Sequence, residues 1–191
     1  EFRRVLFRSA ASETENYSDA PGYMINNVAD MEFVAANSVI YTAAQTLYLN
    51  ANIDLTDSTF THFADLKASF DGCGYTISNQ KESNGGYGLF RNYQGASIQN
   101  LTLDHYHAIG GYGRAILVSE ASVSKALLIE NVTIKNSSVK AITAGANCMG
   151  GLISKSNGPN VTIRNCQILD SVLDGDTVTP GNVGLIAGQI S

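Results

Sequence analysis

Charged residues are scarce in this sequence, and their scarcity narrows the functions that it can have. Lysine, arginine, aspartate and glutamate make up 15% of the 191 residues, and the net charge is -5. A chain of this charge repels nucleic acid and anionic membranes, so basic-patch functions are disfavoured. No apolar run approaches the roughly 18 residues of a membrane span. We therefore expect no nucleic-acid partner and no membrane insertion of this segment.

Proline and cysteine are also few. Three prolines and a shortage of long Leu/Glu/Lys-rich stretches argue against long helices and for many short strands. The three cysteines, Cys73, Cys148 and Cys166, show no metal-ligand spacing. Cys166 occupies a core position of a predicted strand, and a Cys148–Cys166 disulfide between successive repeats stays open. We expect neither a cofactor nor a metal site.

Small, uncharged polar residues are abundant instead. The sequence holds 18 glycines, 18 serines, 17 asparagines and 13 threonines, together about a third of the chain. These residues favour turns. With 44% hydrophobic residues the chain is nevertheless too apolar for disorder, so the sequence predicts a folded, turn-rich protein.

The two ends of the sequence do not look like natural ends. Residues 6–9, Leu-Phe-Arg-Ser, correspond to an in-frame reading of the end of a common sequencing adapter, so we treat residues 1–9 as foreign. Without their three arginines and one glutamate, the net charge falls from -5 to -7. Residues 184–191 stop inside an apolar strand pattern. We expect a fragment from an environmental sequence, truncated at its C-terminus, whose exposed strand edges cause self-association.

An internal repeat organises the rest of the chain. Residues 98–103, 129–134 and 163–168 line up at spacings of 31 and 34 residues, and a shorter relative stands at 76–79. Apolar residues alternate with polar ones in each unit, which is the period of a strand and not of a helix. Between the units a Gly-Leu-Phe type of motif recurs. Units of this size with two or three short strands indicate the coils of a parallel β-solenoid, stacked at about 4.8 Å.

An asparagine recurs in every unit. Asparagine tolerates a left-handed bend, and its amide can bond the same residue one coil away, which predicts an asparagine ladder. The predicted ladder consists of Asn79, Asn100, Asn131 and Asn165. The alternative, N-glycosylation at the sequons of Asn100, Asn131 and Asn160, is disfavoured because the sequon follows from the repeat itself.

The region before the repeats has the pattern of a cap. Residues 10–21 form a polar linker, and residues 22–45 form the predicted N-terminal cap. Its helix spans about residues 28–39, with Asn27 or Asp30 as the capping residue. The β-helix repeat domain then spans residues 46–191, as about five coils with the last one incomplete.

Four segments in order resemble a known group of proteins: 47–56, 70–79, 88–90 and 97–103. They are similar to the opening of bacterial exported right-handed β-helix proteins with GLUG-type repeats, in the broad pectin-lyase-like group. Cys73 stands where that pattern usually has a polar residue, and Ala115 where it has glycine. The resemblance implies an all-β, right-handed parallel β-helix with a short N-terminal capping helix, secreted or on the bacterial cell surface. It implies little about chemistry, because this scaffold hosts lyases, hydrolases and non-catalytic binders.

Catalytic carboxylates are not evident in the repeats. A uronic-acid lyase needs a cluster of carboxylates that binds calcium, and it also needs a basic residue that abstracts a proton. A glycosidase needs two carboxylates about 5 to 9 Å apart. Aligning the units puts Ser78, Gln99, Glu130 and Arg164 in one outward row, with no two acids adjacent. Glu130 and Arg164 are expected to form a surface ion pair. Asp54, Asp57 and Asp71 lie where aspartate commonly serves a turn, so we predict no catalytic residue.

Histidines and tyrosines supply the candidate ligand contacts. His105 and His107 flank Tyr106 directly after a core strand, and alternation would put both imidazoles on one face. Exposed tyrosines can stack on sugar rings. The predicted contacts are His105, Tyr106, His107, Tyr87 and Tyr112, with Tyr75 and Tyr93 as further tyrosines to consider.

The resulting hypothesis is a non-catalytic β-helix scaffold for adhesion or glycan contact. Its expected partners are a polysaccharide or host-surface glycan and the remaining coils of its own solenoid. One alternative is a polysaccharide lyase or glycoside hydrolase whose active site lies on coils not present here. Another is a purely structural spacer.

Overall fold

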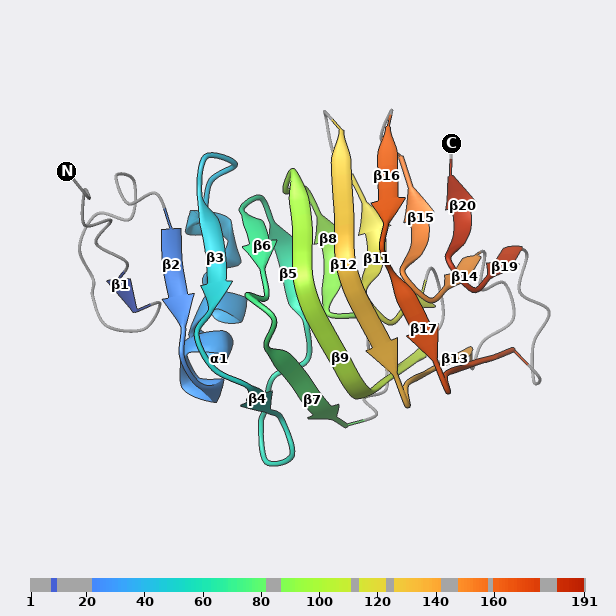
Figure 1. The fold of residues 1–191 in the computed structure, drawn as a ribbon, viewed down its shortest axis with the longest axis horizontal. Coiled ribbons are helices and arrows are strands. Elements are labelled where there is room, and N and C mark those ends of the chain that lie inside the picture. The colour runs from blue at the N-terminus through green and yellow to red at the C-terminus, as the bar shows by residue number, and fades with distance from the viewer. Residues whose placement is uncertain are drawn as a thin grey trace.

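The computed structural model is a parallel β-solenoid, in which successive coils stack their strands side by side (Figure 1). The structure describes residues 8–9, 22–81, 87–110, 114–122, 126–141, 148–157, 160–175 and 182–190. All strand pairs within these residues are parallel. The predicted fold class is confirmed.

The front sheet in Figure 1, which we call the first face, holds one strand from each coil. Its strands are β1 (Arg8–Ser9), β2 (Gly22–Ile25), β3 (Thr46–Leu49), β6 (Ser69–Asp71), β9 (Ser97–Gly110), β12 (Leu127–Lys135) and β16 (Val161–Arg164). The same sheet continues beyond a bend in the coils as β4 (Ile53–Asp54), β7 (Thr76–Gln80) and β17 (Gln167–Leu169). Arg8 and Ser9, which we excluded from the sequence-based prediction, pair with β2.

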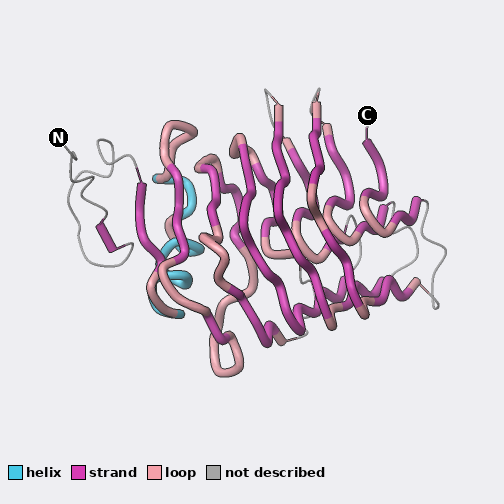
Figure 2. Tube along the Cα trace, in the orientation of Figure 1, coloured by secondary structure: helices cyan, strands magenta, loops and turns pink. Residues whose placement is uncertain are grey.

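The remaining sides of the coils form further parallel sets of strands (Figure 2). The end of β9 pairs with β13 (Ser138–Ala141), which pairs with β18 (Val172–Asp174). A short sheet contains β10 (Arg114–Ala115), β14 (Cys148–Gly150) and β19 (Asn182–Gly184). The back sheet contains β5 (Phe63–Leu66), β8 (Phe90–Tyr93), β11 (Val118–Ala121), β15 (Ile153–Ser156) and β20 (Ala187–Ile190).

The core lies between the first face and the back sheet. Ile98 pairs in register with Ile129 at the 31-residue spacing, so the repeat read from the sequence is one coil. On the opposite side Phe63 pairs with Phe90, and the two rings stack at 5.5 Å. Phe70 from the first face meets Phe90 edge-on at 5.4 Å. All five side chains are fully buried, each contributing about 1.5–3 kcal/mol of hydrophobic stabilisation.

Two rows of left-handed residues bend the four coils that contain β6, β9, β12 and β16. The first row comprises Cys73, Asn100, Asn131 and Asn165, with φ between 50° and 54°. The second row follows a few residues later and comprises Asn79, His105, Asn136 and Asp170, with φ between 47° and 59°. Register fixes this division, because Ile77 pairs with Leu103 and so puts Asn79 opposite His105. The predicted ladder was therefore wrong for Asn79, which belongs to the second bend.

Amide hydrogen bonds connect the bends of neighbouring coils. In the first row Asn131 Nδ2 donates to Asn100 Oδ1 at 3.0 Å, and Asn100 Nδ2 donates to Asp71 Oδ1 at 3.0 Å. In the second row Asn136 Nδ2 donates to Asp104 Oδ1 at 2.9 Å. The ladders thus mix asparagine and aspartate, because any acceptor oxygen at the right place satisfies the amide.

Helix α1 (Val28–Ala36) and the short 3-10 helix η1 (Ser38–Ile40) cover the N-terminal end of the core beside β5 (Figure 1). Asn27 caps α1 by accepting a hydrogen bond from the Asp30 backbone N–H at 2.9 Å. Met31 and Val34 are fully buried. Within the described ranges, no helix has the length and hydrophobicity to cross a membrane.

Candidate functional site

The first face carries outward polar side chains in rows that run from coil to coil. One row contains Asp71, Gln99, Glu130 and Arg164. Arg164 Nε lies 2.6 Å from Glu130 Oε1, and Gln99 Nε2 donates to Glu130 Oε2 at 3.0 Å. The Arg164 hydrogen bond is the main cause that lowers the pKa of Glu130. Glu130 is therefore a carboxylate that is paired with a neighbouring coil on each side.

The alignment of Ser78 with this row was wrong, because Ser78 pairs with Asp104 in a second row. Asp104 Oδ2 lies 3.2 Å from Lys135 Nζ, and its Oδ1 lies 2.8 Å from His105 Nδ1. Burial alone would raise the pKa of Asp104, but the hydrogen bonds from Asn136 and Lys135 outweigh it and lower the pKa. Asp104 is held as a carboxylate by its neighbours, so it is a poor proton acceptor.

The other aspartates serve turns. Asp54 Oδ1 accepts hydrogen bonds from Thr56 at 2.6 Å and from Asn79 at 3.0 Å, and the Thr56 bond is the main cause that lowers its pKa. Asp71 Oδ1 accepts the Cys73 backbone N–H at 2.8 Å. In the part of the chain that the structure describes, no group of three or more metal-ligating side chains occurs.

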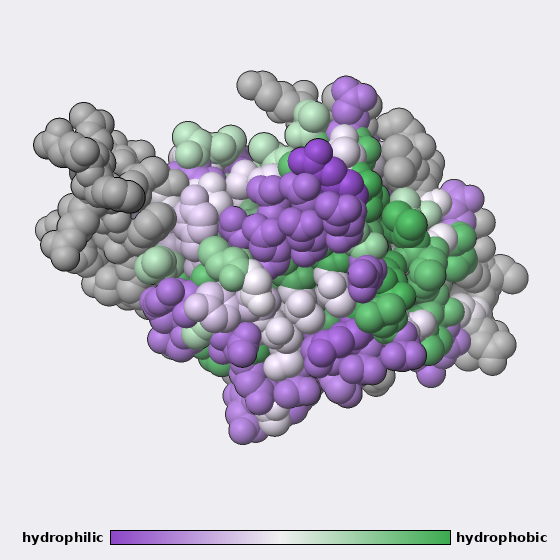
Figure 3. Space-filling view, in the orientation of Figure 1, coloured by the Kyte–Doolittle hydropathy of each residue, from purple (hydrophilic) through white to green (hydrophobic). Residues whose placement is uncertain are grey.

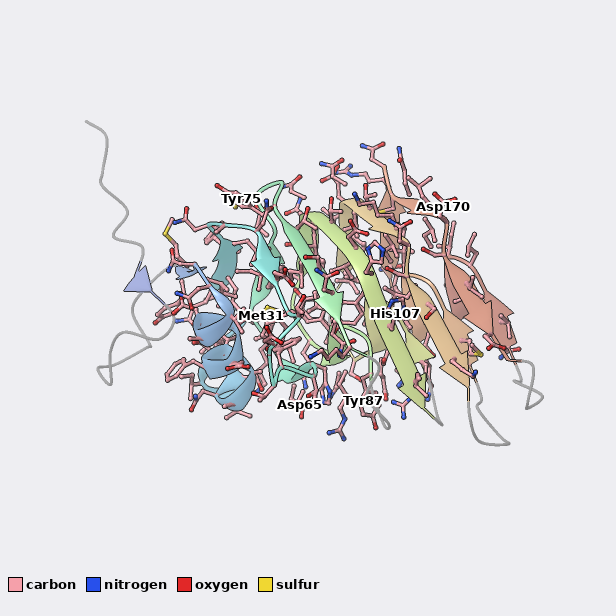
Figure 4. All side chains as sticks on the ribbon, turned by 90° about the horizontal axis from the view of Figure 1, so that it is seen from below. Met31, Asp65, Tyr75, Tyr87, His107 and Asp170 are labelled. Carbon is pink, nitrogen blue, oxygen red and sulfur yellow. The ribbon has the colours of Figure 1, made fainter. Side chains whose placement is uncertain are left out.

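The two histidines lie on different sides of a bend. His105 has a left-handed backbone, so the strand alternation breaks there and His107 projects from the next side of the coil (Figure 4). His107 Nδ1 lies 2.8 Å from Ser138 Oγ. A serine hydroxyl hydrogen-bonded to a histidine resembles the nucleophile and general base of a hydrolase. Among the described residues, however, no carboxylate orients the other ring nitrogen of His107. The His107–Ser138 contact instead connects two neighbouring coils.

Most of the candidate tyrosines are structural. Tyr106 is fully buried, its hydroxyl donates to the Thr61 carbonyl at 3.3 Å, and burial raises its pKa, so its prediction as a ligand contact was wrong. Tyr93 is also fully buried and donates to the Ala68 carbonyl at 3.1 Å. Tyr75 packs partly against the core, and Tyr112 lies outside the described residues.

Tyr87 is different, because it lies at the centre of a basic cluster (Figure 4). Arg114 Cζ is 4.0 Å from the centre of the Tyr87 ring, and Arg91 Cζ is 5.1 Å from it. The His62 ring meets the same ring edge-on at 5.1 Å. We call these four residues the Tyr87 cluster. Burial, followed by the charges of Arg91 and Arg114, lowers the pKa of His62.

Sequence reasoning found Tyr87 but missed the other three members of the cluster. His62 directly precedes β5, Arg91 lies in β8 and Arg114 lies in β10, so the cluster assembles from three successive coils. The usable signal was the repeated Gly-Leu-Phe motif, since Tyr87 and Arg91 flank one copy of it at residues 88–90.

The cysteines form no disulfide. Cys148 is buried, and Cys166 is partly buried, with Sγ 3.3 Å from the Arg164 carbonyl oxygen. Burial is the main cause that raises the pKa of Cys166, which disfavours its thiolate.

Hydrophobic surface gathers at the end of the solenoid that carries the last strands (Figure 3). Leu185 and Ile186 are 52% and 55% exposed there, and both line a cavity of about 270 Å³ together with Ile163 and Ile168. The middle of the first face is mostly hydrophilic in the same view.

The fold and these surfaces define a β-solenoid protein. No protein-family model matches the chain, and no curated protein matches it either. A solved structure with a similar fold is described as a "putative immunoglobulin A1 protease" from Bacteroides ovatus, with a TM-score of 0.55 at 19% sequence identity. The similarity covers 91% of this chain and 63% of that chain, so our chain spans less than two thirds of the neighbour's length. At this identity the similarity shows the fold alone.

Proposed function

We propose that this chain is a rigid scaffold of a secreted or cell-surface protein that contacts a glycan and does no catalysis within the described residues. The observation that carries the proposal is the set of in-register polar rows on the first face. One of these rows is uncharged and contains Thr76, Thr102, Thr133 and Gln167.

Such a row suits a polymer of sugars. Neighbouring strands lie about 4.8 Å apart, so the row repeats hydroxyl groups at short, regular intervals along a stiff surface. A polysaccharide likewise repeats its hydroxyl groups along its length, and hydroxyl groups both donate and accept hydrogen bonds. A rigid surface loses little entropy on binding.

The state of the carboxylates supports a non-catalytic role. Glu130, Asp104 and Asp54 are all engaged by hydrogen bonds or ion pairs from neighbouring coils or turns. Each of these contacts lowers the pKa of its carboxylate, whereas a general acid needs a raised pKa.

The test is binding to a panel of immobilised polysaccharides and host glycans. We expect the unaltered chain to be retained by at least one glycan, and the double variant Thr102→Arg/Thr133→Arg to lose retention because two long side chains cover the row. Val39→Arg is the matched control, since Val39 is 74% exposed on the cap, away from the row. Retention of the double variant at the level of the control, or no retention by any glycan, would overturn the proposal.

A further inference from the structure

Arg114 is a buried charge that has no counter-charge among the described residues. Only 5% of Arg114 is exposed, and its Nε and Nη1 atoms are buried with no hydrogen-bond partner. Neither Arg114 nor Arg91 forms an ion pair within the described residues. Burying an unpaired guanidinium group is strongly unfavourable, so a position of this kind calls for an anion.

The surroundings hold the Arg114 side chain in one place. Its guanidinium group stacks on Tyr87 at 4.0 Å, and Gly110 lies against its other atoms. A side chain at position 110 would put its Cβ into Arg114 Nε, so glycine is what allows this approach. A fixed guanidinium group loses less freedom when it binds a ligand than a mobile one does.

Positive charge accumulates around the same ring. Arg91 lies 5.1 Å from the Tyr87 ring centre and is exposed, so the cluster reaches the surface there. Two guanidinium groups on one ring repel each other, and cation–π attraction offsets this only in part. An anion bound between them would remove the repulsion.

His62 adds a hydrogen-bonding group to the cluster. Its Nδ1 atom is buried and has no hydrogen-bond partner. Burial and the two arginine charges lower its pKa, and a neutral imidazole can still donate one N–H to an anion. The charge of Asp65 acts in the opposite direction and raises the pKa of His62. Asp65 accepts a hydrogen bond from Asn92 Nδ2 at 2.7 Å, however, and forms no ion pair with either arginine.

We propose that the Tyr87 cluster binds the oxyanion group of an acidic glycan, either the carboxylate of a uronic acid or a sulfate ester. The planar guanidinium fork of an arginine matches both groups with paired hydrogen bonds. Arg114 is the main ligand contact, Arg91 guides the anion from the surface, and Tyr87 positions Arg114. The glycan part of this inference rests on the proposed function, whereas the oxyanion part stands on the cluster alone.

The experiment titrates the full chain separately with methyl galacturonate, inorganic sulfate and neutral methyl galactoside. Binding is measured from the shifts of the arginine side-chain Nε–H signals in NMR spectra. We expect at least one of the two anions to shift the Arg114 signal, which is assigned by its loss in Arg114→Gln. The neutral sugar leaves that signal in place. Arg91→Gln weakens anion binding by about tenfold, because one charge-assisted contact is removed. The anion that binds more tightly identifies the source as a uronic acid or a sulfated sugar.

Lys67→Gln is the matched control, because Lys67 is exposed and follows the end of β5 opposite to His62. We expect it to bind the anion as the unaltered chain does. Arg91 is exposed, so Arg91→Gln remains informative even if Arg114→Gln fails to fold. The inference is overturned if neither anion shifts the Arg114 signal, if the neutral sugar shifts it equally, or if Arg91→Gln binds as tightly as Lys67→Gln. If the cluster binds an anion but no polysaccharide retains the chain, the proposed function is contradicted and the oxyanion part of the inference stands.

Discussion

At the scale of single residues, the left-handed bends explain why asparagine recurs in the repeats. A left-handed conformation costs roughly 1–2 kcal/mol for most residues and less for asparagine or aspartate, whose side chains bond locally. The first-row bends carry Asn100 and Asn131, which are also linked by an amide hydrogen bond of 3.0 Å. Asparagine here serves both the backbone and the contact between coils.

We expect Asn131→Ala to destabilise the fold by about 1–2 kcal/mol, because alanine tolerates a φ of 54° poorly and cannot bond to Asn100. Asn131→Gly should cost less, since glycine accepts the conformation and only the hydrogen bond is lost. Urea unfolding monitored by circular dichroism measures both. Equal stability of the alanine and glycine variants would show that the bend imposes no conformational demand.

The same bends show why one residue was misplaced from sequence. Each of the four coils that contain β6, β9, β12 and β16 has two left-handed positions a few residues apart, and asparagine does not fill all of them. Cys73 takes the first bend of its coil, and His105 takes the second bend of its own. A search for asparagine therefore found Asn79 at a second bend and aligned it with first bends. Only the strand register separates the two rows.

At the scale of elements, strand type and spacing were predictable because each coil obeys a local rule. Alternating apolar residues identify a strand whose one side faces the core, and Val132 and Ile134 in β12, two residues apart, are both fully buried as this rule requires. The cap helix was predictable for the same kind of reason, from Asn27 and the apolar residues after it. Its predicted end at residue 39 overran α1, which ends at Ala36.

The Tyr87 cluster was not predictable in this way. His62 and Tyr87 stand 25 residues apart, and nothing in either segment indicates that their rings meet at 5.1 Å. Their contact depends on the register that pairs Phe63 with Phe90. Register comes from the packing of whole coils, which the local pattern does not encode.

Capping by α1 leads to a prediction about stability. Met31 is fully buried at the N-terminal end of the core, so Met31→Ala should destabilise the protein by about 2–5 kcal/mol through lost burial and the cavity left behind. Val39→Ala, at a 74% exposed position of η1, should change stability little. Thermal unfolding compares the two. A Met31→Ala variant as stable as Val39→Ala would contradict the capping role.

At the scale of the whole molecule, the two ends of the solenoid differ. The N-terminal end is covered by α1 and η1, whereas the other end exposes apolar side chains on β18, β19 and the turn that follows β19. The most exposed of these are Val172 at 58%, Ile186 at 55%, Val183 at 52% and Leu185 at 52%. Grouped apolar residues beside open strand edges favour association with another surface.

We therefore expect the chain to self-associate as its concentration rises. The double variant Leu185→Asp/Ile186→Asp should shift the distribution toward monomer, because charges at these positions resist burial in an interface. Val39→Asp, exposed at the cap end, is the control and should self-associate like the unaltered chain. Sedimentation velocity over a range of concentrations measures the effect. A sharp monomer boundary at every concentration of the unaltered chain would contradict it.

The central claim, a glycan-contacting scaffold without catalysis, is tested most directly by one incubation of the chain with the polysaccharide that retains it best. The amount of bound protein and the chain length of the polysaccharide are measured together, by sedimentation and by size-exclusion chromatography. The account predicts saturable binding and an unchanged chain length after prolonged incubation. Shortening of the polysaccharide by the unaltered chain, or an absence of saturable binding, would contradict it.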